Sequence, residues 1–129
     1  VRLMKTILLI VIPLTLIIGF GMFCQGMFQR NADTMAQKLE KLTEDVSQEN
    51  WERAAENLKQ INQSWEPVRS TWQALIDHTE VDRIDESFAR IEKMISVKEQ
   101  KDCLVELTVL KQCFLHIPEK EKLNLSNIF

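Results

Sequence analysis

The sequence predicts an all-α fold, with an N-terminal transmembrane helix that continues into an antiparallel helical bundle of about four helices. The 129 residues contain only three glycines, three prolines and no tyrosine, and they are rich in Leu, Ile, Glu and Lys, which lose little freedom in a helix. Beyond residue 30, apolar residues recur at alternating steps of three and four, which is the helical period. No useful stretch alternates with period two, so no sheet is expected. We therefore predict two parts, an anchor over residues 1–30 with a short cytoplasmic stub, and a single bundle domain over residues 31–129.

The first predicted element is a stretch without charge from Thr6 to Cys24, which stays uncharged to Gln29. Crossing the hydrocarbon core takes about 20 helical residues. Between Ile7 and Phe20 there are eleven Val, Ile, Leu or Phe, enough to favour insertion by several kcal/mol. A proline is tolerated within a membrane helix. The anchor is expected to include Thr6, Ile7, Pro13, Gly19, Phe23 and Cys24.

A cleaved signal peptide is the competing interpretation of this stretch. Signal peptidase needs small residues at the cut, whereas "GFGMFCQGMF" offers bulky Met and Phe, and Phe23 before Cys24 disfavours lipoprotein-type cleavage. We therefore predict an uncleaved, single-pass anchor in the cell membrane. Arg2 and Lys5 should stay cytoplasmic, which places residues 31–129 outside, although Arg30 on the far side weighs slightly against this orientation.

Four apolar seams predict the helices of the bundle. The first helix continues directly from the anchor and ends at the break Ser47–Asn50, where Asn50 can cap the second helix. Pro67 lies inside the second seam without disturbing its register, which predicts one kinked helix. The break Asp77–Glu80 and the polar run Val97–Asp102 delimit the third helix, and Pro118 is expected to end the fourth. The seams are Ala32, Met35, Leu39, Leu42 and Val46; Trp51, Ala54, Leu58, Ile61, Trp65, Val68, Trp72 and Leu75; Val81, Ile84, Phe88, Ile91 and Ile95; and Cys103, Leu107, Leu110, Phe114 and Ile117.

Short connections make consecutive helices antiparallel. The turn Asp77–Glu80 and the tail from His116 should therefore meet at the membrane-proximal end, and the breaks Ser47–Asn50 and Val97–Asp102 at the distal end. After Pro118 the tail has a charged step and then an amphipathic ending. We expect this ending to pack on the bundle rather than to bind the membrane interface.

Charge and cysteine usage exclude several classes of function. From Asn31 onward the chain has 13 Lys and Arg against 19 Asp and Glu, a net charge of −6, so a nucleic-acid partner is not expected. Cys103 and Cys113 share one predicted helix, roughly 15 Å apart, which is too far for a disulfide. The cysteines are expected to be small buried apolar residues.

The segment "LIDHTEVDRIDE" holds five carboxylates and a histidine between Asp77 and Glu86. One hypothesis is a divalent-cation site built from His78, Asp82, Asp85 and His116, since imidazole and carboxylate suit zinc and its neighbours. The alternative is a capped helix start, with Thr79 or Asp82 as the N-cap and carboxylates at the positive end of the dipole.

The capping alternative is preferred, because the spacing matches no metal signature. It leaves Asp77 and His78 unexplained, for which we expect a packing role, either a carboxylate–histidine pair or an Asp that accepts from an indole N–H. A melting temperature that responds to chelator would instead indicate the metal site.

No arrangement typical of an enzyme is recognisable. The sequence has no defensible Ser, His and Asp order, no glycine-rich phosphate loop and no H-E-x-x-H. The three tryptophans lie on the apolar seam and are expected in the core rather than in a ligand cage. We therefore expect no catalysis and no cofactor beyond the possible divalent cation.

The stretches "NWERA", "LIDHTEVDRIDESFARI" and "LVELTVLKQCFLHIPEKEKLNLSNIF" resemble bacterial domain-of-unknown-function family 4363, over essentially the whole chain. The resemblance implies small single-pass membrane proteins with an all-helical external domain, and it supplies no activity. It also suggests that the acidic turn and the His116–Glu121 corner form one shared feature. Pro67 departs from the straight helix that the resemblance implies. The family-like positions are Trp72, Asp77, His78, Glu80, Asp82, Ala89, Arg90, His116, Pro118 and Glu119.

Taken together, these patterns predict a membrane-anchored, extracytoplasmic, non-enzymatic interaction or scaffolding module. Its expected partners are the lipid bilayer, through the N-terminal helix, and either an unidentified protein or a second copy of the chain. Self-association would use the Ala32–Val46 seam, which intramolecular packing also needs.

Overall fold

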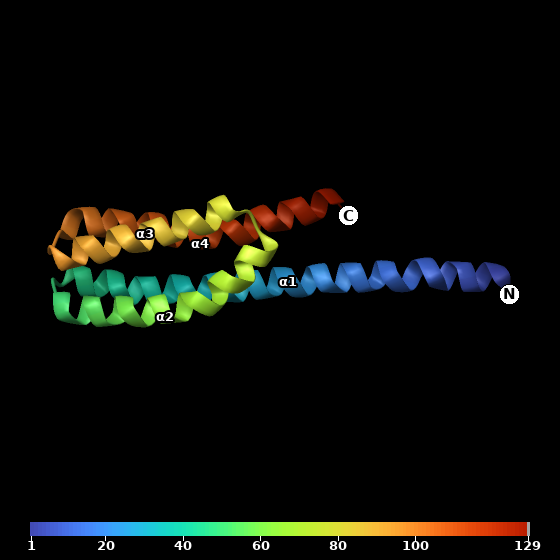
Figure 1. The fold of residues 1–129 in the computed structure, drawn as a ribbon, viewed down its shortest axis with the longest axis horizontal. Coiled ribbons are helices and arrows are strands. Elements are labelled where there is room, and N and C mark those ends of the chain that lie inside the picture. Colours follow the sequence, from blue (N-terminus) through green and yellow to red (C-terminus); the bar gives the residue numbers. More distant parts are fainter. Residues whose placement is uncertain (129) are drawn as a thin grey trace.

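The computed structural model describes the backbone of residues 1–128 and the side chains of residues 1–121. Within this range the chain is all-α and contains no strand, as the sequence predicts. Figure 1 shows a bundle from which one helix projects far to the N-terminal side. The helices are α1 (Arg2–Ser47), α2 (Trp51–Leu75), α3 (His78–Ser96) and α4 (Gln100–Ile128).

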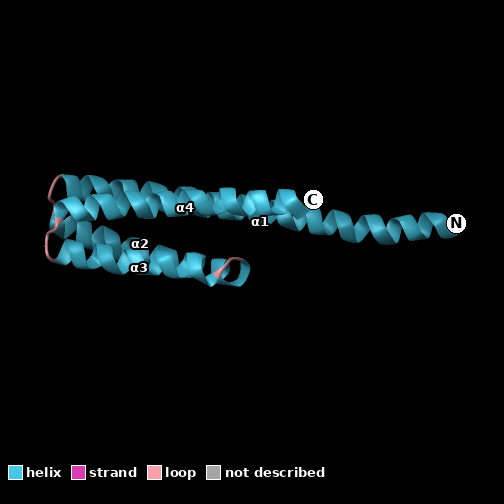
Figure 2. Ribbon diagram, turned by 90° about the horizontal axis from the view of Figure 1, so that it is seen from above, coloured by secondary structure: helices cyan, strands magenta, loops and turns pink. Residues whose placement is uncertain are grey.

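The helices form an antiparallel ring in which each packs against its neighbours. α1 contacts α2 and α4, and α3 contacts α2 and α4 (Figures 1 and 2). Residues 1–20, here called the stalk, project beyond the bundle and are exposed throughout. We call the end of the bundle near the stalk, with the α2–α3 turn, the stalk end, and the opposite end the far end. Of the predicted anchor positions, Thr6, Ile7, Pro13 and Gly19 lie in the exposed stalk, Phe23 is exposed just beyond it, and Cys24 is half-buried.

The core consists almost entirely of the predicted seams. All but three of the seam residues are buried, which confirms both the helical register and the continuation of the first helix through residue 30. Trp51 and Val68 are partly buried against the core, and Leu75, in the last turn of α2, is 42% exposed. Phe28 is also buried, so the packed part of α1 begins a turn before the predicted domain boundary.

The far end is built from two copies of one turn. In each copy a single residue lies in the left-handed region, Glu49 at φ 56° and Lys98 at φ 59°. The following backbone N–H then bonds the carbonyl five residues earlier, which is the Schellman ending of a helix. Asn50 also caps α2 as predicted, accepting from the N–H of Arg53 at 3.3 Å. The closing bonds are Asn50 N–H to Asp45 O at 2.9 Å and Glu99 N–H to Met94 O at 2.8 Å.

The predictions for the two prolines of the bundle have different outcomes. Pro67 lies inside α2, which stays one helix as expected and changes direction in Figure 1. The prediction that Pro118 ends α4 is wrong, because the helix continues to Ile128. A proline removes one helical hydrogen bond, but Pro118 is buried and its carbonyl accepts from Gln25 Nε2 at 3.0 Å. Tertiary contact with α1 thus outweighs the local preference. The expected packing of the tail's apolar side chains beyond Glu121 lies outside the described residues.

Candidate functional site around the acidic turn

The acidic turn connects α2 to α3 through only two residues outside the helices. Ile76 is extended, with φ −127° and ψ 172°. Asp77 is the N-cap of α3, and its carboxylate accepts from the N–H of Thr79 at 3.1 Å. This hydrogen bond lowers the pKa of Asp77. The prediction of a capped helix start is therefore confirmed, but the expected cap at Thr79 or Asp82 is wrong because the helix begins earlier.

The acidic turn meets α4 at the stalk end, as the antiparallel order predicts. Lys120 Nζ lies 2.9 Å from Glu80 Oε1, and the hydrogen bond between them raises the pKa of Lys120. Burial raises the pKa of the neighbouring Glu121, more than Lys120 lowers it. A charged pair thus joins the start of α3 to the segment after Pro118, so the two family-like stretches are neighbours in space.

The four candidate metal ligands do not form a cluster. His78, Asp82 and His116 are exposed, and Asp85 makes contacts within the bundle instead. Among the residues that the structure describes, no group of three His, Cys, Asp or Glu side chains is placed to hold a metal ion. The divalent-cation site therefore stays a prediction from the sequence, without a described arrangement that favours it.

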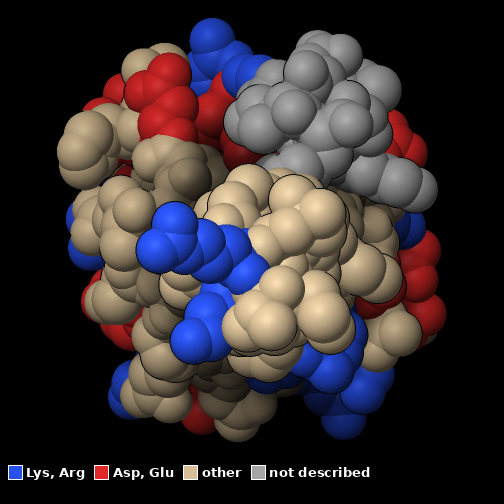
Figure 3. Space-filling view, turned by 90° about the vertical axis from the view of Figure 1, so that its right-hand side faces the viewer, with Lys and Arg blue, Asp and Glu red and all other residues tan. Residues whose placement is uncertain are grey.

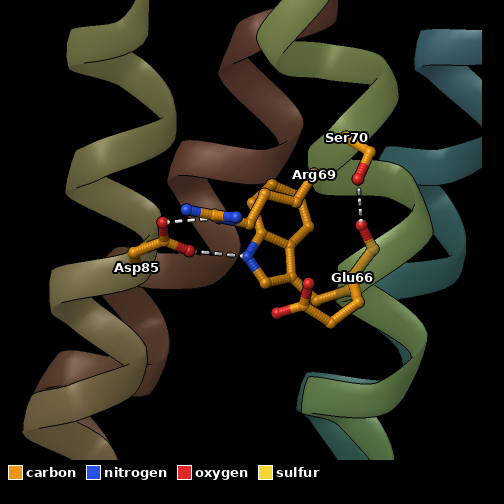
Figure 4. A network of polar contacts seen from close by, with 5 residues as sticks. Glu66, Arg69, Ser70 and Asp85 are labelled. Carbon is orange, nitrogen blue, oxygen red and sulfur yellow. Dashed lines mark hydrogen bonds and ion pairs between the residues drawn. The ribbon is translucent and has the colours of Figure 1, made fainter.

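Asp85 joins α3 to α2 through both carboxylate oxygens (Figure 4). Its Oδ1 accepts from the indole Nε1 of Trp65 at 2.8 Å, and its Oδ2 accepts from Arg69 Nε at 2.8 Å. The hydrogen bond to Asp85 raises the pKa of Arg69. An Asp–indole contact was expected for Asp77, and the structure assigns it to Asp85. With both oxygens occupied by donors, this carboxylate has a structural role in the bundle.

A second polar cluster joins α3 to α4 further from the turn. Arg90, a family-like position, lies 2.9 Å from Glu106 Oε1 through Nη2. Ser87, which is buried, donates to the same oxygen at 2.9 Å. Arg90 also approaches Glu86, one turn earlier, at 3.8 Å. Arg90 thus joins α3 to α4 through Glu106 and lies near one carboxylate of the acidic segment, that of Glu86.

An aromatic cluster fills the core behind the acidic turn. It contains Trp65, Trp72, Phe28, Phe88 and Phe114, whose neighbouring ring centroids lie 5.3–6.3 Å apart, several of them edge to face. Trp72 is fully buried and Trp65 is 2% exposed. Such pairs add to the hydrophobic gain of burial. Trp65 and Trp72 are therefore core residues, as predicted, with rings too enclosed to form an open cage, whereas the third tryptophan, Trp51, is only partly buried.

An open groove of about 540 Å³ lies between α2 and α3 in the half of the bundle toward the far end. Its floor includes Leu58 and Ile95, which are nearly buried, and its rim includes Lys59, Glu66 and Glu92. The lining contains no histidine or cysteine. The one hydroxyl of the lining, that of Ser96, donates to the Lys93 carbonyl at 2.7 Å and has no imidazole beside it to activate it for acyl transfer.

The cysteines of α4 are packing residues. Cys103 is fully buried, and burial raises the pKa of its thiol to about 11. Cys113 is half-buried, and burial raises its pKa as well. Because the thiolate is the reactive form, both thiols are poor nucleophiles at neutral pH. The expectation of a small buried apolar residue is confirmed for Cys103, whereas Cys113 is only partly buried.

Two contacts at the stalk end were not predictable from the sequence. Asp85 bonds Trp65 and Arg69 across two helices, and Gln25 bonds Pro118 across ninety-three positions. Gln25 did carry a signal, because it is a polar residue between apolar Cys24 and small Gly26 in a charge-free stretch. Asp85 carried none, because five carboxylates of similar spacing surround it.

A comparison with known protein families finds a match that covers the bundle. The family model described as "Domain of unknown function (DUF4363)" matches residues 22–128. The match takes in the bundle and the last turns before it, and leaves out residues 1–21, so it is shorter than the resemblance seen in the sequence. No curated protein and no solved structure matches the chain. Since the match covers well over half of the chain, the chain belongs to the DUF4363 family.

Proposed function

We propose that the chain is a membrane-anchored, non-enzymatic interaction or scaffolding module. The observation that carries this proposal is the contrast within α1, a single helix of 46 residues. Its first half is apolar on every side and exposed, and its second half forms a seam in the core. Among the described residues, α1 is the one helix long and apolar enough to cross a membrane. A helix that is apolar all round needs an apolar environment, and lipid supplies it.

Charge supports an orientation with the bundle outside the cytoplasm. Arg2 and Lys5 lie at the free end of the stalk, and basic residues beside an anchor favour the cytoplasmic side. Figure 3 looks at the molecule from this end, where basic side chains lie beside uncharged ones. A signal sequence has the same character, and the direct passage of α1 into the core favours an anchor that is retained.

The polar residues of the acidic segment support a structural role rather than a catalytic one. Asp77 caps a helix, Glu80 pairs with Lys120, and Asp85 accepts from two donors. Glu80 and Asp85 hold helices together and Asp77 ends one, so the surface that remains for a partner is the outside of the bundle. The proposed partner is another protein or a second copy of the chain at the membrane.

Extraction and a topology reporter test the anchor. The full-length chain should stay with membranes at alkaline pH, whereas a variant with Leu9→Arg and Leu16→Arg should be released, because each arginine costs about 2.5–3.5 kcal/mol at a helix centre. Gln37→Arg, at an exposed bundle position, is the matched control and should remain. Alkaline phosphatase fused after Phe129 should be active. Release of the unmodified chain, or an inactive phosphatase with intact insertion, would contradict the anchor or its orientation, respectively.

Photo-crosslinking in cells tests the interaction role. A photoreactive amino acid is placed at one exposed position on each helix, Gln37, Lys59, Glu92 or Val105. At least one position should give a discrete product that the anchor-disrupting arginines abolish, and its mass identifies a second copy or another protein. The absence of a product at all four positions would refute an interaction module.

A further inference from the structure

Helix α4 does not stop at the stalk end of the bundle. It continues for ten residues beyond Pro118, to Ile128, and Figures 1 and 2 show its C-terminal end beyond the α2–α3 turn, on the side toward the stalk. Up to Pro118 its position is fixed by α1, because Ile117 is 2% exposed and Gln25 Nε2 donates to the Pro118 carbonyl at 3.0 Å. The segment after Pro118 therefore starts at the level of Gln25 and runs toward the stalk.

The antiparallel register gives the depth of this segment. Ten helical residues advance about 15 Å, so the backbone of Ile128 lies at about the level of Thr15. Between Lys5 and Gln25, α1 has no charge, and a membrane span needs about 20 such residues. If α1 is the anchor, the end of α4 cannot remain in water, because the bilayer surface lies near the level of Gln25.

Along residues 119–129 the sequence changes from charged to uncharged at about the height of the expected bilayer surface. Glu119, Lys120, Glu121 and Lys122 come first, and no charged side chain follows them. The seven residues from Leu123 to Phe129 contain four large apolar residues, two asparagines and one serine. Charges at headgroup height followed by apolar and small polar residues are typical of a helix end at the boundary between headgroups and acyl chains.

We propose that residues 119–128 of α4 form a second lipid contact, with the charged step among the headgroups and the segment from Leu123 at the acyl boundary of the leaflet that faces the bundle. This inference rests on the proposed anchor. The segment is interfacial rather than part of a second span, because it begins with four charged residues and continues with two asparagines and a serine, which suit the headgroup boundary rather than the middle of a bilayer. The bundle is then attached to the membrane by two helices.

Depth-dependent quenching in vesicles tests the contact with the full-length chain. A fluorescent amino acid replaces Ser126, Thr15 or Lys101 in separate samples, which leaves the cysteines native. The vesicles contain zwitterionic and anionic phospholipid, with a nitroxide placed either near the headgroup or in the middle of the acyl chain. The label at position 126 should be quenched by the shallow nitroxide at least about twice as strongly as the label at 101, and the label at 15 should be quenched by the deep one.

The outcomes separate the two proposals. A quenched label at 15 with a label at 126 that behaves like 101 overturns the second lipid contact and leaves the anchor standing. An unquenched label at 15 refutes the anchor itself. As a further check, Leu125→Asp with Ile128→Asp should reduce quenching at 126 to the level at 101 and leave 15 unchanged. Undiminished quenching in this variant would show that the uncharged residues do not hold the segment in lipid, and would also overturn the proposal.

Discussion

The two ends of the bundle are constructed in different ways. The far end repeats one Schellman turn, with Glu49 and Lys98 in the left-handed region, and each turn is completed by backbone bonds within its own few residues. The stalk end has a single two-residue connection, and its order comes from contacts between helices. These are the Asp85 network, the Glu80–Lys120 pair and the bond from Gln25 to Pro118.

At the far end the local turns are supplemented by Gln100, whose Nε2 donates to the carbonyls of Val46 and Ser47 at 3.2 and 3.0 Å. One small bundle is thus closed mainly by local turns at one end and mainly by tertiary contacts at the other. The far-end turns are formed largely by bonds within each turn, whereas the contacts of the stalk end need all four helices in register. We therefore expect substitutions at the stalk end to lower the stability of the bundle more than matched substitutions at the far end. Their effects should also extend to more than one helix.

The largest effect should come from the tryptophans at the two ends. Trp72→Ala removes the centre of the aromatic cluster, where the side chain is fully buried, and should destabilise the bundle by about 3–5 kcal/mol. Trp51→Ala, at the far end, removes a partly buried ring and should cost about 1–2 kcal/mol. Chemical denaturation of the full chain in micelles, followed by circular dichroism, measures both. Equal losses of stability in the two variants would contradict the proposed difference between the ends.

Carboxylates at the two ends provide the next test. Asp85→Ala leaves the indole of Trp65 and the guanidinium of Arg69 without their acceptor, and should cost about 1–3 kcal/mol. Asp45→Ala, at the far end, removes an acceptor from Asn57 alone and should cost about 1 kcal/mol. Asp82→Ala, exposed on the same helix as Asp85, is the control and should stay within about 0.5 kcal/mol of the parent chain. A result in which Asp82→Ala matches Asp85→Ala would argue against the network.

The two N-caps differ in their response to pH. Asp77 caps α3 as a carboxylate whose pKa is lowered by the Thr79 N–H, and Asn50 caps α2 with an amide that does not titrate. A lowered folded-state pKa gives a stabilisation that is complete above the unfolded-state value near 3.8 and disappears as the pH falls through the folded-state pKa. The melting temperature of Asp77→Asn should therefore lie below that of the parent chain at pH 7, and the gap should close in strong acid. A gap that persists at the lowest pH would assign the effect to packing instead. Asn50→Ala should lower the melting temperature by a similar amount at both pH values.

The smallest effect should be a gain at the far end. A residue other than glycine in the left-handed region destabilises the fold by roughly 1–2 kcal/mol. Replacing it by glycine removes this strain but gives the unfolded chain more conformational freedom, which offsets roughly 0.5–1 kcal/mol of the gain. Glu49→Gly and Lys98→Gly should each stabilise the bundle by about 0.5 kcal/mol, additively because the turns are separate. Ile76→Gly, in the extended turn of the stalk end, has no such strain to relieve and should destabilise. A loss of stability in either Glu49→Gly or Lys98→Gly would contradict backbone strain at these two turns.

The same contrast explains what the sequence could and could not predict. The seams, the Asn50 cap and the far-end breaks follow from local patterns, so helix order and core were predictable. The cap at Asp77 was misassigned because Asp77, Thr79 and Asp82 can all cap, and only the contacts of Ile76 and α2 choose among them. Pro118 was misjudged because its burial and its contact with Gln25, a residue ninety-three positions away, are tertiary features that the local sequence does not show. The partners of Asp85 are likewise decided by tertiary register.

The continuity of α1 fixes where the far end can be. From Gln25 to Ser47 the helix is unbroken and advances about 33 Å, so with α1 as the anchor the far-end turns stand at a set height above the bilayer. A membrane-bound partner that contacts the far-end turns must therefore itself extend to that height above the bilayer. The azimuth is set as well, since one residue inserted between stalk and bundle would rotate the whole bundle by about 100° about the anchor axis. With α1 as the proposed anchor, the bundle thus presents its faces at one height and in one direction relative to any neighbour bound to α1 within the bilayer.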